Sequence, residues 1–291
     1  MTPQSLERPV RTGQLSLNCA KEESPLYEHR EFEGTLVISQ AVIGSGSFSN
    51  VYSGRSVKDG KIYAVKTMRK DTLLDGPLAE LRTLEILNDP GHPQVIEYFG
   101  SYGGESIVLE HYQTDLFRWL SYMSRCEMQL AHSFEPIIGT DRWKEWAVSL
   151  SDALRYIHSK GVIHTDLKPN NLLLNVTDGL PSTPVIADFS YAVVDQPYIG
   201  RSTPIYCAPE IRGNDCEPTA QSDIYALGVI LLFCATGQEP YSNAKNTYQR
   251  VMWQRAISPI DAFDEAATMR IAPVRHYVST LVNDRLLDLT R

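Results

Sequence analysis

The sequence predicts an α+β fold of two lobes, a small antiparallel β-rich N-lobe with one main helix and a larger helical C-lobe. Short apolar runs bounded by Gly, Asp and Ser fill residues 35–67, which is typical of an antiparallel meander. Beyond Thr114 the apolar residues recur at three- and four-residue steps, which indicates helices. With 43% hydrophobic residues among 291, the chain has enough apolar surface for a large core.

Each element of the N-lobe has its own sequence signal. Residues 1–34 are polar and weakly periodic, which predicts a flexible N-terminal extension before one domain over 35–291. Leucines at helical spacing predict a helix over 78–87, ended by Asn-Asp-Pro-Gly. The β-rich runs predict strands over 35–39, 50–53, 62–66, 95–100 and 106–112. The lobe boundaries then fall at about 35–111 for the N-lobe, 110–114 for a hinge and 115–291 for the C-lobe.

The C-lobe is predicted to be built on helices separated by loops. Periodic apolar residues predict a helix over 143–159, with Gly161 as its C-terminal stop. The stretch 121–141 breaks the periodicity and predicts an inserted loop, and 175–184 is dense in turn formers and predicts another. The longest apolar run, 226–235 apart from one glycine, is far shorter than the ~20 residues of a membrane span and predicts a buried core helix.

Charge and cysteine usage limit the classes of partner and compartment. The formal charge is −8 without a basic run, so we expect no nucleic-acid partner and no anchor to an anionic membrane. The five cysteines have no paired spacing, which favours a reducing compartment. We therefore expect an intracellular protein, cytoplasmic or nuclear, without a membrane span.

The first motif with chemical meaning is the run Ile43–Val51, Ile-Gly-Ser-Gly-Ser-Phe-Ser-Asn-Val. Glycines in a tight hairpin let backbone N–H groups close over an anion. A strand follows the run, and not a helix, so it is not a dinucleotide-binding fingerprint. Taken alone, it equally fits a Gly/Ser hairpin without a ligand.

A lysine and a glutamate follow this hairpin. Lys66 lies in the alternating strand Tyr63–Thr67 and shares a face with Ala64, the face expected to look toward the hairpin. There its ammonium could pair with phosphate oxygens, and Glu80 on the next helix could hold it in place. A lone lysine in a strand is more often solvated, so the pair gains meaning only from its neighbours.

Polar side chains are concentrated in the loop of residues 162–174, Val-Ile-His-Thr-Asp-Leu-Lys-Pro-Asn-Asn-Leu-Leu-Leu. Asp166, Lys168 and Asn171 lie between two apolar strands, and Pro169 argues against a helix there. A carboxylate, an ammonium and an amide at this density predict a phosphoryl-transfer centre. The next strand, over 185–187, ends at Asp188, and Mg²⁺ prefers such hard oxygen ligands.

Two further runs complete the series: Thr-Pro-Ile-Tyr-Cys-Ala-Pro-Glu over 203–210 and Ser-Asp-Ile-Tyr-Ala-Leu-Gly over 222–228. In this order and spacing the motifs resemble the eukaryotic protein kinases of the serine/threonine type, over residues 35–291. The resemblance implies a bilobal protein-kinase fold with ATP and Mg²⁺ between its lobes.

The resemblance also implies roles in catalysis and metal binding. Asp166 matches the catalytic aspartate that orients the substrate hydroxyl and accepts its proton, and Lys168 would neutralise the transferring phosphoryl group. Asn171 and Asp188 would ligate Mg²⁺. Asp223 would anchor a stacked hydrophobic spine, whose members would be Leu84, Tyr98, His164 and Phe189.

For the nucleotide, the resemblance makes Lys66 the contact of the α/β-phosphates and Glu80 its helix partner. Glu85 is the second candidate for that partner and would face away. Leu109 would be the gatekeeper of the hinge. The residues implied to surround ATP are Ile43, Gly44, Ser45, Gly46, Ser47, Phe48, Ser49, Val51, Ala64, Lys66, Glu110, Tyr112 and Leu173.

The sequence departs from the family pattern at three positions that bear on the site. Ser49 replaces the third loop glycine, a mild change. Ser190 replaces the glycine after Asp-Phe and restricts the backbone there. Thr165 replaces the arginine that receives an activation-segment phosphate, so one bidentate partner of such a phosphate is lost. The arginine expected to pair with Glu210 would be Arg291 or lie just beyond it.

Two functions remain open at this point. The first is a serine/threonine protein kinase that acts on protein substrates, since Ala208–Glu210 resembles the segment of a peptide-docking platform. The second is a pseudokinase that acts as a scaffold, which the departures at Ser49 and Thr165 favour slightly. We prefer the first because the residues that pseudokinases usually lose are all present: Lys66, Glu80, Asp166, Asn171 and Asp188. Regulators could bind at 1–34 or 121–141.

Overall fold

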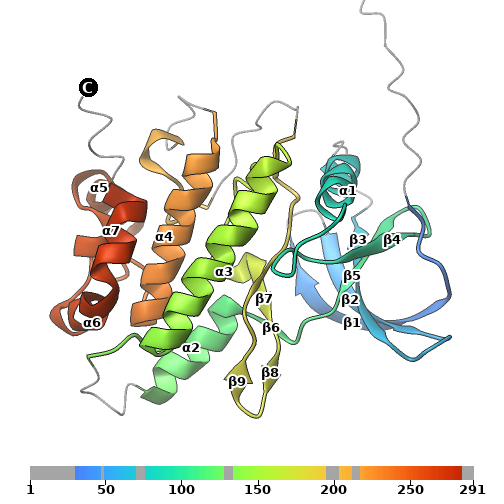
Figure 1. Cartoon of the computed structure of the whole chain (residues 1–291), viewed down its shortest axis with the longest axis horizontal. Helices are drawn as coiled ribbons and strands as arrows, with labels where there is room; N and C mark the ends of the chain where they lie inside the picture. Colours follow the sequence, from blue (N-terminus) through green and yellow to red (C-terminus); the bar gives the residue numbers. More distant parts are fainter. Residues whose placement is uncertain are drawn as a thin grey trace, which may run out of the picture.

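The chain folds into two lobes of different composition. The computed structural model describes residues 30–46, 49–69, 76–127, 134–194, 203–211 and 217–283. Figure 1 shows a β-sheet and helix α1 together on one side of the molecule, and the helices α2 to α7 on the other side. The predicted α+β architecture, a small β-rich N-lobe and a larger helical C-lobe, is therefore confirmed.

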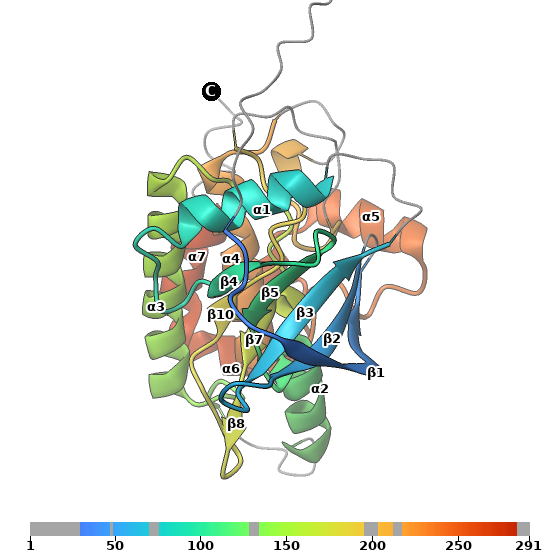
Figure 2. The same ribbon diagram turned by 90° about the vertical axis from the view of Figure 1, so that its right-hand side faces the viewer.

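The N-lobe is built on one five-stranded antiparallel sheet of order β1-β2-β3-β5-β4. Helix α1 (Gly76–Leu87) runs across one side of this sheet (Figure 2). The fourth strand starts later than predicted because Val95 pairs instead with Ile186 of the C-lobe. The strands are β1 (Leu36–Ser45), β2 (Ser49–Ser56), β3 (Ile62–Met68), β4 (Tyr98–Tyr102) and β5 (Ser106–Glu110).

The alternation of β3 separates two environments. Tyr63 and Val65 belong to a small outer core together with Leu36 and Val108. Ala64 belongs to the main core, and the two-residue repeat of a strand places Lys66 on the same face as Ala64. Lys66 is accordingly only 5% exposed. The predicted shared face of these two residues is confirmed, and the solvated alternative for the lysine is wrong.

Residues 30–32 pack against the edge of the sheet. Phe32 N donates to Ser101 O and Ser101 N donates to Arg30 O, each at 2.8 Å, which adds a short parallel pairing to β4. The Phe32 ring lies edge-on to the Tyr63 ring, with centroids 5.2 Å apart. This part of the predicted N-terminal extension is therefore attached to the N-lobe, whereas residues 1–29 lie outside the described residues, where flexibility stays a prediction.

This attachment depends on a glycine in β4. Gly100 has φ of +136°, and a Cβ there would lie 2.5 Å from Phe32 N and 2.6 Å from Glu31 C. We expect Gly100→Ala to lower the free energy of unfolding by about 1–3 kcal/mol, because it combines a strained φ with a backbone collision. Equilibrium urea unfolding measures the change. Gly104→Ala is the matched control, since Gly104 has φ of +74° but no atom within 4 Å of the added Cβ. Equal losses in both variants would contradict the packing of residues 30–32.

The C-lobe is organised around helix α4. Every residue from Tyr225 to Thr236 is buried, as predicted for the apolar run. A capping box between Thr219 and Ser222 starts the helix, and Gly237 in the left-handed region ends it. The helices of this lobe are α2 (Leu116–Glu127), α3 (Thr140–Ser159), α4 (Ala220–Thr236), α5 (Thr247–Ala256), α6 (Glu265–Ile271) and α7 (Arg275–Asn283).

A small sheet in the C-lobe carries the loops of the predicted site. Its antiparallel strands are β6 (Thr114–Asp115), β7 (Leu172–Leu174) and β10 (Val185–Ile186), in the order β10-β7-β6. Because β7 and β10 are antiparallel, the residue before β7 lies beside the residue after β10. Ala187 N accordingly donates to Asn171 O at 2.9 Å. This pairing places Asn171 next to the segment that starts with Asp188.

The predicted loop over 121–141 is wrong at both ends. Helix α2 continues through 121–127, and α3 already begins at Thr140, while residues 128–133 lie outside the described part of the chain. The helix continues because Met123 extends the apolar stripe of Leu116, Trp119 and Leu120 and packs on the main core.

The predicted loop over 175–184 contains a β-hairpin. Strands β8 (Val176–Thr177) and β9 (Leu180–Pro181) pair around Asp178 and Gly179. Both turn residues have positive φ, +52° and +79°, as a two-residue Asp-Gly hairpin turn requires. The loop prediction is therefore wrong here, and the Asp-Gly pair was the sequence signal for the hairpin.

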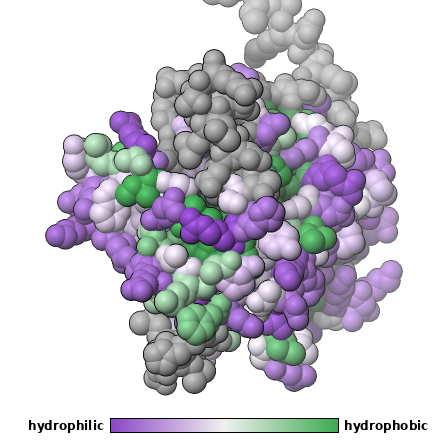
Figure 3. Space-filling model, turned by 60° about the vertical axis from the view of Figure 1, so that its left-hand side comes forward, coloured by the Kyte–Doolittle hydropathy of each residue, from purple (hydrophilic) through white to green (hydrophobic). Residues whose placement is uncertain are grey.

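The described surface of the helical lobe is mixed. Figure 3 shows hydrophilic side chains over most of one face, with hydrophobic ones scattered among them. Tyr248 and Met252 of α5 are among the exposed apolar side chains. None of the helices in the described ranges has the length and apolar content needed to cross a membrane.

Candidate active site

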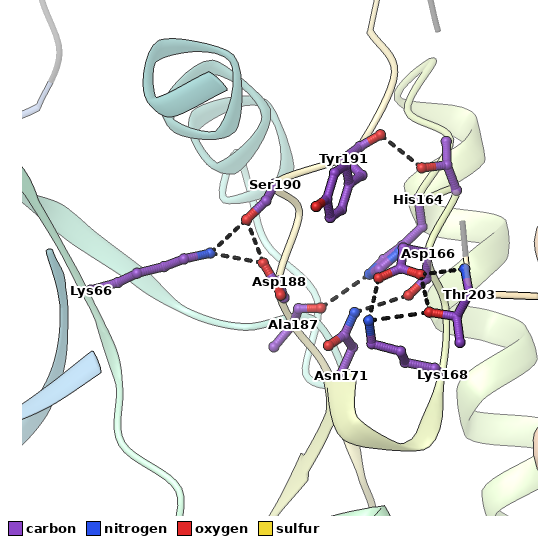
Figure 4. Close-up of polar contacts among 11 residues, drawn as sticks. Lys66, His164, Asp166, Lys168, Asn171, Ala187, Asp188, Ser190, Tyr191 and Thr203 are labelled. Carbon is purple, nitrogen blue, oxygen red and sulfur yellow. Dashed lines mark hydrogen bonds and ion pairs between the residues drawn. The ribbon is translucent and has the colours of Figure 1, made fainter. Parts of the chain in front are cut away.

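A buried aspartate of α4 shapes the loop that carries the predicted catalytic residues. Asp223 Oδ2 accepts the backbone N–H of His164 at 2.9 Å, and Oδ1 accepts that of Thr165 at 3.0 Å. Thr165 has φ of +67°, an unfavourable value for a β-branched residue, so these bonds hold the chain in a strained turn. Thr165 Oγ1 also donates to Tyr191 O at 2.7 Å. The next residue, Asp166, lies beside Lys168, Asn171 and Thr203 (Figure 4).

The carboxylate of Asp166 lies among a hydroxyl, an amide and an ammonium. Its Oδ1 accepts Thr203 Oγ1 at 2.7 Å and Thr203 N at 3.0 Å. Its Oδ2 accepts Lys168 Nζ, and Lys168 Nζ also lies 3.3 Å from Thr203 Oγ1. The side chain of Asp166 is only 4% exposed. A carboxylate this close to a hydroxyl can take its proton, and the adjacent ammonium can balance negative charge that develops there.

The N-lobe contributes Lys66, whose ammonium joins two carboxylates. Lys66 Nζ donates to Glu80 Oε1 at 2.6 Å and to Asp188 Oδ1 at 2.8 Å. Glu85, the other candidate, instead accepts the backbone N–H of Arg30. Lys66 also donates to Ser190 Oγ at 2.8 Å. The ion pairs connect β3, α1 and the segment after β10. Figure 4 shows the contacts of Lys66 with Asp188 and Ser190.

The three charged groups shift one another's pKa. Burial by itself lowers the pKa of Lys66, but the charges of Asp188 and Glu80 outweigh burial and raise it above its usual value. Burial raises the pKa of Asp188, yet the charge and hydrogen bond of Lys66 outweigh burial and hold it well below its usual range. The pKa of Glu80 is raised by burial and by repulsion from Asp188. Lys66 and Asp188 are therefore charged at neutral pH.

The donor set beside this cluster fits Mg²⁺. Asn171 Nδ2 donates to Asp166 O at 2.9 Å, which leaves its amide oxygen for a cation. The side chain of Asp188 is 38% exposed, so its carboxylate remains accessible. Among the described residues, no group of three or more His, Cys, Asp or Glu could hold a metal ion. A cation between Asn171 and Asp188 would thus take further ligands from phosphate and water, as Mg²⁺ does.

The predicted glycine-rich loop forms the hairpin between β1 and β2. Gly44 pairs with Val51, and a Cβ on Gly44 would meet the Val51 side chain at 3.5 Å. Gly46 N donates to Ser49 O at 2.9 Å, which closes the hairpin. Residues Ser47 and Phe48, also predicted to surround the nucleotide, lie outside the described residues.

The flanks of this hairpin are held by an arginine. Arg69 Nη2 donates to Ser45 Oγ at 2.8 Å and to Asn50 Oδ1 at 3.0 Å. Ile43, just before Gly44, keeps 39% of its surface exposed. The hairpin therefore offers backbone groups and an exposed apolar side chain on the N-lobe side of the site.

The remaining predicted nucleotide contacts lie in β3, in and just after β5, and in β7. Ala64 is opposite Leu109 in the β3–β5 pairing. Glu110 closes β5, and its carboxylate accepts Tyr112 Oη–H at 2.8 Å. Leu173 is half-buried in the middle strand of the small sheet. Their contacts with a nucleotide stay predictions.

The residues predicted to form a stacked spine are buried. The ring of His164 lies 4.9 Å from that of Phe189. His164 Nε2 lies 3.0 Å from Ala187 O, which ties the loop before β7 to the end of β10. Leu84, Tyr98, His164 and Phe189 are each at most 2% exposed. The structure thus shows the His164–Phe189 contact, and the stacking of all four residues as one spine stays a prediction.

Several contacts at this site have no signal in the local sequence. The bonds of Thr203 to Asp166, of Thr165 to Tyr191 and of Ser190 to Lys66 were not predicted, although each residue was singled out by its place in a motif. The expected pairing of Glu210 with Arg291 falls outside the described residues, because Arg291 is not among them.

The sequence is similar to those of known proteins. Residues 38–285 match the model of the protein kinase domain family. cAMP-dependent protein kinase type 3 of Saccharomyces cerevisiae is 29% identical over 250 residues, 79% of this chain and 57% of that protein. Aurora kinase B of Danio rerio is 31% identical over 218 residues, 72% of this chain and 63% of that protein. CBL-interacting serine/threonine-protein kinase 3 of Arabidopsis thaliana is 29% identical over 228 residues, 72% and 47% of the two chains.

The fold and site define a two-lobed protein with a lysine–carboxylate cluster facing a loop of Asp, Lys and Asn. The family match spans most of the sequence, so this chain belongs to the protein kinase domain family. The three relatives named above are protein kinases by name, and one of them is a serine/threonine-protein kinase. The chain spans about half the length of the curated relatives it matches.

Proposed function

We propose that this protein transfers the γ-phosphoryl group of ATP to serine and threonine hydroxyls of protein substrates. The observation that carries the proposal is the placement of charge on two sides of one site. On one side Lys66 Nζ lies 2.8 Å from Asp188 Oδ1, and on the other Asp166 Oδ1 lies 2.7 Å from a threonine hydroxyl. Between them, Asn171 and Asp188 offer the oxygen donors for a divalent cation.

The acceptor side would activate and orient the substrate hydroxyl. Asp166 Oδ1 takes the proton as the hydroxyl oxygen attacks the γ-phosphorus, and the bond from that phosphorus to the β–γ bridging oxygen breaks to release ADP. Lys168 balances the charge that develops on the transferring group. The hydroxyl of Thr203, which already lies against Asp166 and Lys168, supports this assignment.

The donor side would hold the triphosphate. Lys66 donates to the α- and β-phosphate oxygens, and Glu80 keeps its ammonium in place. Mg²⁺ bound by Asn171 and Asp188 would neutralise phosphate charge. The glycine-rich hairpin would cover the phosphates with backbone N–H groups, since its glycines lack side chains that would block their approach.

A scaffold without transfer activity is the second candidate, and Thr165 and Ser49 favour it. Because Thr165 stands where the family has an arginine, the chain lacks one guanidinium that could bind an activation-segment phosphate. Against this candidate, the hydroxyl of Thr165 joins the catalytic loop to Tyr191 without any phosphate. The charged residues of the site are also in contact with one another, which a site released from catalysis would not need.

Two further parts of the proposal are the class of substrate and the compartment. Protein substrates are favoured because Ala208–Glu210 follows Thr203 in the segment expected to dock peptides. An intracellular location is supported by Cys234, whose thiol is free and buried in α4. Binding of regulators at 1–34 or 121–141 stays a prediction.

Phosphoamino-acid analysis tests the proposed function. The wild-type protein is incubated with [γ-³²P]ATP, Mg²⁺ and degenerate peptides that carry a single Ser, Thr or Tyr. The proposal expects label on Ser and Thr peptides and none above background on Tyr peptides. Tight binding of Mg–ATP without label on any peptide or protein would favour the scaffold instead.

A further inference from the structure

The hydroxyl of Ser190 lies at the centre of the charged cluster between the lobes. Its Oγ is 2.8 Å from Lys66 Nζ, 2.5 Å from Asp188 Oδ1 and 3.1 Å from Glu80 Oε2. We call these four residues the Lys66 cluster. Within it, Ser190 contacts each of the other three members, and Figure 4 shows its hydroxyl between Lys66 and Asp188.

Counting donors and acceptors shows what the hydroxyl supplies. An ammonium has three protons, and Lys66 gives one each to Glu80, Asp188 and Ser190. A hydroxyl accepts and also donates one proton, so Ser190 accepts from Lys66 and donates to one of the two carboxylates. Glycine, the residue that the family carries here, would supply neither bond. The third proton of Lys66 and one of the two carboxylates would then lose this partner.

The cluster connects elements of both lobes. Lys66 is on β3, Glu80 on α1, and Asp188 and Ser190 follow β10 in the C-lobe. Asp188 has φ of +62°, so its segment is held in a conformation that L-residues rarely adopt. The Ser190 bonds therefore bear on the position of α1 and on the orientation of the Asp188 carboxylate together.

We propose that Ser190 is a positioning residue, whose hydroxyl holds Glu80 and Asp188 on Lys66 before nucleotide binds. The inference rests on the proposed function, because it concerns the readiness of the same site for Mg–ATP. Without the hydroxyl, a smaller fraction of the free protein has the binding-competent arrangement, and the apparent affinity falls by that fraction. Once Mg–ATP is bound, the phosphates and metal order the same groups, so the chemical step changes little.

Three substitutions separate the hydroxyl from the backbone effect. Ser190→Ala removes the hydroxyl and keeps the Cβ restriction, Ser190→Gly removes both, and Ser190→Thr keeps both. We expect Ser190→Ala to raise KM and Kd for Mg–ATP about tenfold, the effect of one hydrogen bond to a charged group, with kcat within about threefold of wild type. Ser190→Thr should restore both values. Ser159→Ala, an exposed serine at the end of α3, is the matched control and should change neither.

Hydrogen exchange in the nucleotide-free protein gives a readout that needs no activity. Amides of α1 should exchange faster in Ser190→Ala and Ser190→Gly than in wild type, and at the wild-type rate in Ser190→Thr. If wild type binds Mg–ATP but transfers nothing, the proposed function fails while Kd and exchange still test Ser190. Unchanged Kd and unchanged α1 exchange in Ser190→Ala, or failure of Ser190→Thr to restore them, would overturn the inference.

Discussion

Replacing Asp166 with asparagine should lower kcat for peptide phosphorylation by about 10²–10⁴-fold, the contribution typical of one general base. Asparagine has nearly the same shape, and its amide oxygen can still accept the backbone N–H of Thr203, so the loop should keep its path. The amide cannot take a proton from the substrate hydroxyl, however, and it leaves Lys168 without its carboxylate partner. KM for Mg–ATP should stay within a few-fold of wild type, because Lys66 and Asp188 are unchanged.

Steady-state kinetics with a phosphorylated-peptide readout measures this effect. Asp178→Asn is the matched control: Asp178 lies in the β8–β9 turn with φ of +52°, a conformation that asparagine adopts equally well. The control should retain wild-type kcat. An Asp166→Asn variant with wild-type kcat would rule out the assigned role of this carboxylate.

Replacing Lys66 with methionine should have two separable effects. Methionine fills a similar volume without charge, so Glu80 and Asp188 lose the ammonium between them. Breaking a buried ion pair by removing one partner costs about 3–5 kcal/mol. The exposure of Asp188 toward solvent places the expected loss of unfolding free energy at the low end of that range. Transfer should fall together with ATP affinity, because the phosphates lose their lysine.

A double variant separates the buried charge from the lost phosphate contact. In Lys66→Met/Glu80→Gln the second change removes one of the two unpaired carboxylates, so thermal stability should recover in part while transfer stays as low as in Lys66→Met. Thermal unfolding and the transfer assay are run on both variants and on Lys144→Met, an exposed lysine of α3, as control. Recovery of transfer along with stability would mean that Lys66 serves the fold and not the phosphates.

The elements with a regular pattern of apolar residues could be predicted from the sequence. The alternation in β3 predicted that Lys66 shares a face with Ala64, and the leucine spacing predicted helix α1. The long apolar run of α4 indicated the centre of the C-lobe. The end of α2 was missed because Met123 is one apolar residue in a polar context and is fixed by packing on the core.

The contacts that hold the site together depend on residues far apart in the chain. Lys66 and Ser190 are separated by 124 positions and Asp166 and Thr203 by 37, so no local pattern reports their bonds. Motif order identified the charged residues, but the bonds of a hydroxyl that replaces a glycine required coordinates. The attachment of residues 30–32 could not be predicted either. It is possible because Gly100 has no side chain, and no local pattern shows which segment lies against that glycine.

The magnesium dependence of ATP binding tests most directly whether these side chains form one site. Calorimetric titration of ATP is run with and without Mg²⁺ on wild type, Asp188→Asn and the control Asp178→Asn. The account predicts that Mg²⁺ strengthens ATP binding to wild type and to the control by about tenfold or more, and that Asp188→Asn loses this gain. Equal ATP affinity with and without Mg²⁺ in wild type, or an undiminished gain in Asp188→Asn, would contradict it.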